Sequence, residues 1–231
     1  MRHSFVILAS IIMMTALSGC WRTTADWHQK LTLVVDTPAG EASGSSVIEV
    51  RFAGRNKVFL SDLDSATFRM HGEAVVVEVL PGKYLFALLG GQDQLLYVLL
   101  GENGKGMEQT IPAILAQREP LTVDPRAPSR FVNHTYSPML VTFDDISDPK
   151  SVKLVDPLDL AASFGPGVSL KSVTIQITDE PVTQGRIERV LGWLSSAWPN
   201  RLDGQRFGTI RTDHPFANSL SANSFSTEIH K

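Results

Sequence analysis

The first third of the chain alternates apolar and polar residues with the two-residue period of β-strands. In residues 30–36, the side chains of Leu31, Leu33 and Val35 fall on one face of such a strand. Residues 46–52 repeat the alternation after a stretch rich in Pro, Gly and Ser. The pattern therefore predicts two half-buried strands joined by a turn.

A second pair of strands is expected further along the chain. The apolar runs Ala74–Leu80 and Lys83–Leu89 lie on either side of Pro81 and Gly82. A Pro-Gly pair between two apolar runs is a strong turn pattern. We therefore expect a second hairpin here.

Two short helices should follow this hairpin. Gln94–Leu100 is too short for its period to distinguish strand from helix, but Leu, Gln and Tyr outnumber β-branched residues in it, which favours helix. Met107–Gln117 also favours helix. Pro112 should confine that helix to an early turn or split it, because proline lacks an N–H and its ring clashes with the preceding turn.

The second half of the chain mixes strands and helices. The predicted elements are a strand over Met139–Phe143, a helix from Asp156 to Phe164, a strand over Ser172–Thr178, and a helix capped by Thr183 that carries Ile187, Val190, Leu191 and Leu194. Asp156 can cap a helix whose first turn holds Pro157, where the missing N–H costs nothing. The four apolar residues of the last helix follow the i, i+3, i+4, i+7 spacing of a buried helix face.

These patterns divide the chain into six segments. They are a signal peptide over 1–19, a tether over 20–29, a β-rich half over 30–117, a Pro-rich connector over 118–138, an α+β half over 139–204, and a polar C-terminal strap or tail over 205–231. In the last segment Phe207, Ile210, Phe216, Leu220 and Phe225 are spaced singly, as in a strap that packs loosely across a surface. The expected fold class is α+β and β-rich, with an antiparallel sheet or sandwich in the first half, a few short helices and an α+β second half.

Two parts of the chain resemble known families. The stretch LTLVVDTPAGEASGSSVIEV resembles the opening hairpin of transthyretin-like and Cna-B-like sandwich modules, with a strand, an Asp-x-x-Gly turn and a second strand. The segment from DDISDPKSVKLVDPLDL through RIERVLGWL is similar to the end of uncharacterised proteobacterial proteins. The first resemblance implies a β-sandwich, and the second implies a bacterial origin.

The N-terminus has the layout of a secretory signal peptide. Arg2 precedes an uncharged apolar run over Phe5–Leu17, and this run is shorter than the about 20 residues that a spanning helix needs. It ends in Leu17-Ser18-Gly19-Cys20, which contains the only cysteine of the 231-residue chain. These four residues resemble the lipobox of bacterial lipoproteins.

The resemblance to a lipobox implies a modified N-terminus. Cleavage would fall between Gly19 and Cys20, and the Cys20 thiol would carry a diacylglyceryl group and palmitate-type chains. Because Trp21 rather than Asp follows, the rule of that family implies sorting to the outer membrane, facing the periplasm. Two or more acyl chains hold a protein stably on a bilayer, at about 0.8 kcal/mol per buried CH₂. The alternative is that Cys20 is a small buried structural residue.

Composition excludes some classes of partner. Removal of residues 1–19 takes away Arg2 and no acid, which leaves 20 basic and 24 acidic residues and a net charge of −4. Such a chain has no electrostatic footprint for nucleic acid. With 43% hydrophobic and 19% charged residues it is an ordinary globular protein, and one cysteine cannot form a disulfide within it.

Candidate chemistry is sparse in the sequence. Asp144, Asp145 and Asp148 could contribute to a calcium site, but Ile146 interrupts their alternation and no loop glycine follows, so turns and helix caps are the favoured interpretation. Gly101–Gly106 lacks the leading glycine and the hydroxyl of a phosphate-binding loop. The histidines show no metal-ligand spacing, and we expect no cofactor and no catalytic residue.

The sequence therefore predicts a lipid-anchored envelope protein that binds a partner or supports structure without catalysis. Its partners would be the membrane, through the lipid, and an envelope protein. The alternative is an envelope hydrolase or small-ligand-binding protein whose site forms only when the Asp144–Asp159 loop approaches a histidine. Trp193 and Trp198, near the end of the last predicted helix, could line a partner surface, although we expect them to close the core.

Overall fold

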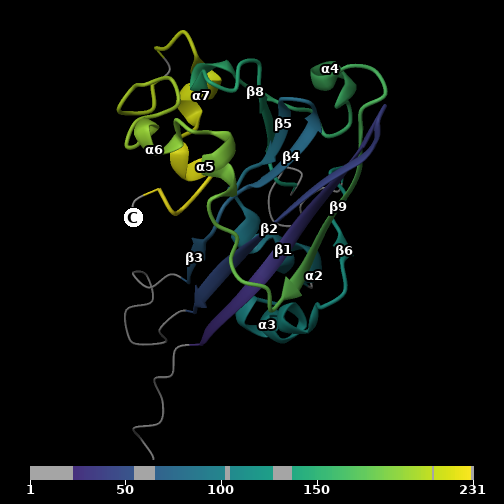
Figure 1. Cartoon of the computed structure of the whole chain (residues 1–231). Coiled ribbons are helices and arrows are strands. Elements are labelled where there is room, and N and C mark those ends of the chain that lie inside the picture. The colour runs from purple at the N-terminus through teal and green to yellow at the C-terminus, as the bar shows by residue number, and fades with distance from the viewer. Residues whose placement is uncertain (1–22, 55–65, 102–104, 127–136, 210, 230–231) are drawn as a thin grey trace, which may run out of the picture.

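The computed structural model describes residues 23–54, 66–101, 105–126, 137–209 and 211–229. Its strands form two antiparallel sheets, as the β-rich prediction requires (Figure 1). The five-stranded sheet has the order β3-β2-β1-β9-β6, with β1 Thr24–Thr37, β2 Gly40–Ala53, β3 Thr67–His71, β6 Leu121–Thr122 and β9 Ser169–Thr178. The four-stranded sheet has the order β4-β5-β7-β8, with β4 Val75–Leu80, β5 Lys83–Ala87, β7 Leu140–Phe143 and β8 Val152–Leu154.

Both predicted hairpins are present, but the first is longer than expected. β1 pairs with β2 from Thr24 opposite Ala53 to Thr37 opposite Gly40. Residues 24–29, which we assigned to a tether, are therefore strand. The alternation of buried positions extends back to Trp27, which is 5% exposed. The sequence pattern did not predict this N-terminal extension of the strand, because the polar residue Gln29 occupies an inward-facing position where an apolar residue is expected.

Gln29 is buried with hydrogen bonds to both its amide nitrogen and its amide oxygen. Its Nε2 donates to the carbonyl of Gln92 at 2.6 Å, and its Oε1 accepts from Trp27 Nε1 at 2.9 Å. The Gln92 amide in turn donates to the carbonyl of Leu88 at 2.9 Å. A buried polar network that is fully satisfied rigidifies its surroundings, and this one ties β1 to the start of α2.

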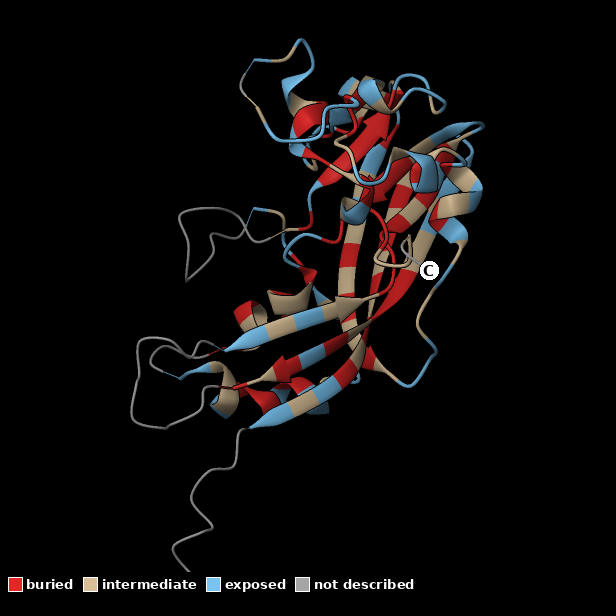
Figure 2. Ribbon diagram, turned by 90° about the vertical axis from the view of Figure 1, so that its left-hand side faces the viewer, coloured by how far each residue is buried: buried red, intermediate tan, exposed pale blue. Residues whose placement is uncertain are grey.

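The two halves of the sequence share both sheets. β9, from the second half, pairs with β1 along most of its length. β7, also from the second half, pairs with β5 through Val141 opposite Phe86 and Leu140 opposite Ala87. The predicted strands over 139–143 and 172–178 are thus confirmed, and each completes a sheet that the first half begins. Figure 2 shows buried residues alternating with intermediate and exposed ones along these strands.

Helices α2 (Gln92–Leu100) and α3 (Met107–Ala116) pack against each other at the end of the five-stranded sheet where β1 begins (Figure 1). The helix preferred for Gln94–Leu100 is confirmed. The prediction for Pro112 was wrong, because α3 continues through it. An interior proline costs about 3 kcal/mol. Burial of Ile111 and Ile114, which are 7% and 0% exposed, offsets that cost.

The helices of the second half are shorter than predicted. No helix starts at Asp156, whose carboxylate accepts the Leu158 N–H in a turn, and only α4 (Ala161–Phe164) is helical. The last predicted helix is broken into α5 (Arg186–Val190) and α6 (Leu194–Ala197). Thr183 caps neither of them, since its hydroxyl accepts the Val47 N–H at 2.9 Å. Tertiary hydrogen bonds replace the predicted local caps.

The C-terminal segment belongs to the core, so the prediction of a loosely packed strap was wrong. It contains α7 (Pro215–Ser219) and the 3₁₀ turn η3 (Ala222–Ser224), and a similar 3₁₀ turn, η2 (Pro149–Ser151), lies earlier in the chain. Phe225 is 0% exposed, and its ring centroid lies 5.7 Å from that of Phe86 and 5.9 Å from that of Phe143. Ile210 lies outside the described residues.

Asp203 holds the loop that precedes α7. Its Oδ2 accepts from Thr212 Oγ1 and Asn218 Nδ2, both at 2.8 Å, and its Oδ1 accepts the Gln205 N–H at 3.0 Å. Burial opposes ionisation of Asp203, but these hydrogen bonds together lower its pKa. The carboxylate therefore organises the loop in its charged form.

We expect Asp203→Ala to lower the free energy of unfolding by about 1–3 kcal/mol, because buried donors lose their acceptor. Urea denaturation measures the effect. Asp213→Ala, an exposed position in the same loop, is the control and should lie within about 0.5 kcal/mol of wild type. Equal stability of the two variants would contradict this role of Asp203.

Candidate functional site

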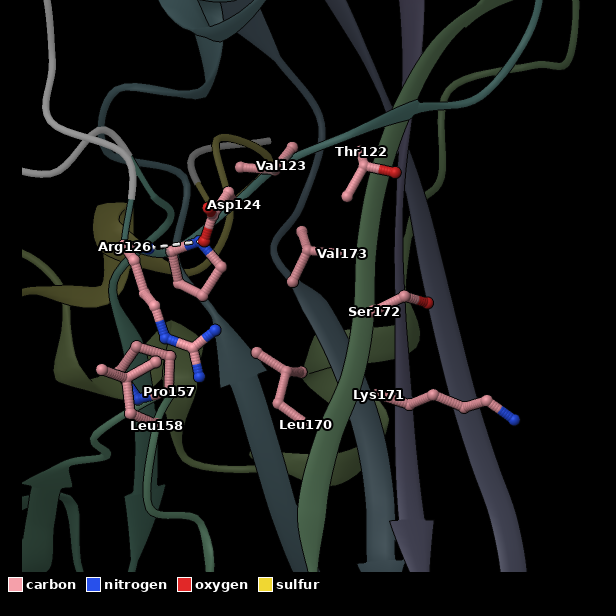
Figure 3. Close-up of a pocket in the computed structure, with 11 residues that line it drawn as sticks. Thr122, Val123, Asp124, Arg126, Pro157, Leu158, Leu170, Lys171, Ser172 and Val173 are labelled. Carbon is pink, nitrogen blue, oxygen red and sulfur yellow. Dashed lines mark hydrogen bonds between the residues drawn. The ribbon is translucent and has the colours of Figure 1, made fainter.

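A pocket of about 300 Å³ lies beside β9 at the edge of the five-stranded sheet (Figure 3). Its walls come from residues 122–126, which begin in β6, from Pro157 and Leu158 in the loop after β8, and from residues 170–173 of β9. Ligand sites commonly have volumes of about 300–1,000 Å³. We call this cavity the edge pocket.

Other pockets of similar volume have a different character. One of about 320 Å³ lies between the ends of two hairpins, at residues 37–42 and 78–81. Another, of about 340 Å³, lies at Gly106–Gln109 beside Phe52 and Ala66. The edge pocket differs from both because it runs along a part of β9 that, among the described residues, is paired on one side only.

β9 is paired on one side along most of its length and on the other side only briefly. β6 pairs with it through Leu121 opposite Ile175 and Thr122 opposite Thr174. The Val123 N–H then donates to the carbonyl of Val173 at 2.8 Å, and the chain leaves the sheet. Within the described ranges, no strand pairs with Ser169–Ser172 on this side. We call Ser169–Ser172 the β9 edge.

A bulge shapes the β9 edge. Val34 lies opposite Ser172 and Val35 opposite Leu170, so Lys171 is an extra residue without a counterpart on β1. Bulges bend a strand and are common beside binding sites, where they redirect side chains. The Lys171 side chain points away from the pocket (Figure 3) and forms an ion pair with Glu41. The bulged lysine therefore does not cover the edge.

Arg126 brings a positive charge into the pocket. Figure 3 shows its side chain directed toward Pro157 and Leu158, with Leu170 facing it from β9. The Arg126 N–H donates to Asp124 Oδ1 at 2.9 Å, which fixes the turn. Its guanidinium forms no ion pair with any residue that the structure describes. Leu158 is 54% exposed, so a guanidinium without an ion-pair partner among the described residues lies beside exposed apolar surface.

The acidic candidates serve local turns, as the favoured interpretation proposed. Asp145 Oδ1 accepts the Ser147 N–H at 2.9 Å, and Asp148 Oδ1 accepts the Lys150 N–H at 2.9 Å. The hydrogen bonds from Ser147 lower the pKa of Asp145. Asp144 forms an ion pair with Lys153. In the part of the chain described, no group of three or more His, Cys, Asp and Glu could hold a metal ion.

Among the described residues, no histidine forms an ion pair or hydrogen bond with an acid of the Asp144–Asp159 loop, although α7, which follows His214, contacts η2 and β8 of that loop. His28 Nδ1 lies 2.8 Å from the carbonyl oxygen of Glu180, His71 pairs with Glu228, and His214 precedes α7. His134 and His230 lie outside the described residues. The alternative of a site between this loop and a histidine therefore gains no support from the described part of the chain.

A buried acid outside the edge pocket has a structural role. Glu73 is 0% exposed, and its carboxyl group accepts the N–H groups of Arg186 and Ile187 at the start of α5. Burial, opposed by these hydrogen bonds, raises the pKa of Glu73, and the neighbouring Glu188 raises it further. Glu188 Oε2 is buried without a hydrogen-bond partner. A proton on Glu73 would satisfy this oxygen, so we assign the two acids to the core rather than to catalysis.

The two tryptophans near the last predicted helix differ in environment. Trp193 packs against Phe143 with ring centroids 5.7 Å apart, and its Nε1 donates to the carbonyl of Ile146 at 2.8 Å. The prediction of a core residue is confirmed for Trp193. It was wrong for Trp198, which is 42% exposed, because the helix ends before it and Trp198 lies outside the buried face.

Sequence reasoning did not identify the edge pocket. Arg126 and Asp124 lie in the Pro-rich connector, where no period predicts structure. Leu158 lies where we expected a helix, and Leu170 precedes the predicted strand. The extension of β9 to Ser169 was harder to anticipate, because Val168 and Leu170 alternate one residue out of phase with Val173, Ile175 and Ile177. The bulge at Lys171 absorbs this shift.

Cys20, Gly19 and the signal peptide lie outside the described residues. In the described part of the chain, no helix has the length and apolar character needed to cross a membrane. No protein-family model matches the chain, and comparisons with curated proteins and with solved structures found no significant match.

Proposed function

We propose that this protein is a lipid-anchored binding module of the bacterial cell envelope, held on a membrane through Cys20 and facing the periplasm. The observation that carries the proposal is the position of the fold relative to the lipobox. β1 begins at Thr24, so only three residues separate an acylated Cys20 from the five-stranded sheet. Three residues span at most about 10 Å, which would hold the fold close to the bilayer.

The distance between the anchor and the edge pocket also supports binding at the pocket. The β9 residue Val173 lies opposite Leu33 on β1. The segment from Thr24 to Leu33 spans roughly 30 Å at the usual rise of a strand. The pocket would therefore lie away from the anchor, where an envelope protein could reach it. Its lining supplies the Arg126 guanidinium, the Asp124 carboxylate, hydroxyl groups and apolar carbons, which can together recognise a ligand.

Radiolabelled palmitate fed to the source bacterium tests the anchor. Wild-type protein should incorporate label and fractionate with the outer membrane, because several acyl chains bind a bilayer stably. Cys20→Ser should lose both properties completely. Ser18→Ala is the matched control, since the lipobox accepts Ala or Ser there, and it should retain both.

Mass spectrometry of the purified protein decides the covalent chemistry. We expect a mature chain that starts at Cys20 with the mass of a diacylglyceryl group and fatty acid added. An unmodified cysteine within a longer N-terminus would refute the anchor.

A further inference from the structure

We propose that the edge pocket binds an extended segment of another protein, which adds a strand to the five-stranded sheet at Ser169–Ser172 and places an Asp or Glu side chain against Arg126. This inference rests on the proposed binding role of the protein, and it does not depend on the lipid.

The unpaired backbone of β9 is the first step of the argument. An edge strand presents N–H and C=O groups that another chain can pair with, and strand addition of this kind is a recurrent mode of peptide recognition. β6 already occupies the same position for two residues, at Leu121 and Thr122. A bound segment would continue the path of β6 past Val123, along the roughly 13 Å of the β9 edge.

The described residues around the edge leave this path open. Lys171, which could have blocked it, is directed away and paired with Glu41. The connector turns off through Asp124 and the following proline, and proline cannot donate a hydrogen bond to a neighbouring strand. The described part of the connector therefore leaves a cavity beside the β9 edge instead of covering it.

Charge identifies the chemistry of the occupant. The Arg126 guanidinium has no acidic partner among the described residues and points into the pocket (Figure 3). A guanidinium pairs with a carboxylate through two parallel hydrogen bonds. Alternate side chains of an extended segment point to opposite sides. An apolar side chain next in line on the same side would therefore cover Leu158, which is 54% exposed.

Selection from displayed random peptides of about seven residues, long enough to overhang the edge, tests the proposal. The target is the full lipoprotein in detergent micelles. We expect enrichment of peptides that alternate β-branched or aromatic residues and carry Asp or Glu at one fixed position. No enrichment, or enriched peptides without an acid, would overturn the proposal.

A synthetic copy of the most enriched peptide then locates the site by fluorescence anisotropy. Arg126→Glu should weaken binding about tenfold to a hundredfold, because charged hydrogen bonds are replaced by repulsion, and should favour a peptide with Lys in place of the acid. Arg69→Glu is the control, since Arg69 is exposed on β3 at the opposite edge of the same sheet, and it should leave affinity unchanged. Equal effects of the two variants would overturn the assignment.

Strand pairing and the identity of the occupant each have a direct measurement. A peptide N-methylated at alternate amides, which cannot pair with an edge, should lose binding if strand addition is correct; retained binding contradicts it. Sedimentation of the protein without peptide should show a monomer, whereas a dimer abolished by Arg126→Glu would assign the edge to a second copy instead. Because Cys20→Ser should bind the peptide normally, failure of this inference is distinguishable from failure of the anchor.

Discussion

Replacing Glu73 by alanine should destabilise the fold by about 3–5 kcal/mol. The substitution leaves the N–H groups of Arg186 and Ile187 without an acceptor, and each buried donor left unpaired costs about 1–3 kcal/mol. The lost side-chain volume adds a cavity between β4 and α5. Chemical denaturation at pH 5 gives the value directly. Glu78→Ala, at an exposed position of β4, is the control and should lie within about 1 kcal/mol of wild type.

Glu73→Gln separates the contribution of the Glu73 proton to stability from that of the hydrogen bonds to α5. Its carbonyl oxygen still accepts from α5, and its amide can donate to the unpartnered Glu188 Oε2, so the loss at pH 5 should be about 1 kcal/mol. Because the pKa of Glu73 is raised above its usual value of 4.5 in the fold, the folded protein holds the proton more tightly than the unfolded chain. Wild-type stability should therefore fall as the pH rises from 4.5 through the raised pKa.

The glutamine variant cannot lose this proton, so its stability deficit relative to wild type should shrink as the pH rises from 4.5 through the raised pKa of Glu73. Urea titrations of both proteins across this range measure the trend. A deficit that is constant with pH would show that Glu73 is ionised in the fold throughout, and a deficit as large as that of Glu73→Ala would show that the amide cannot replace the carboxyl group.

Phe225→Ala should cost about 3–5 kcal/mol of stability, as large aromatic truncations in a core do. The Phe225 ring contacts both Phe86 and Phe143, and its carbonyl accepts the Ala74 N–H at 2.7 Å. The residue thus closes the four-stranded sheet from the far end of the chain. Thermal and urea denaturation should both register the loss.

Phe207 in the same segment provides a matched comparison. It is 76% exposed, so Phe207→Ala removes the same atoms from solvent rather than from the core and should change stability by less than about 0.5 kcal/mol. If the segment packed loosely, the two substitutions would have similar small effects. A difference of several kcal/mol between them would confirm that the C-terminal residues belong to the core.

The local pattern of apolar and polar residues was sufficient to predict a strand wherever one face of the strand is buried and the other faces solvent. Leu31, Leu33 and Val35 alternate because β1 has such faces, and Pro81 with Gly82 marks a turn that needs φ of +73° at the glycine. These features depend on neighbours in sequence, so the β-rich class and both hairpins could be predicted. Exceptions arose where a tertiary partner replaced a local one, as Gln92 does for Gln29.

The sequence by itself determined the strands of both hairpins, the strands β7 and β9, the hairpin turns and the expectation of an anchor at Cys20, but not the short strands β3, β6 and β8. Only the tertiary structure decided that Phe225 is buried, that Glu73 caps a helix more than a hundred residues away, and that no described strand pairs with β9 at Ser169–Ser172 on the side of Arg126. The physical reason is that burial and strand pairing depend on which segments meet in space. The local sequence pattern around a residue does not reveal its contacts with distant segments. The candidate site is formed by segments that lie far apart in the sequence.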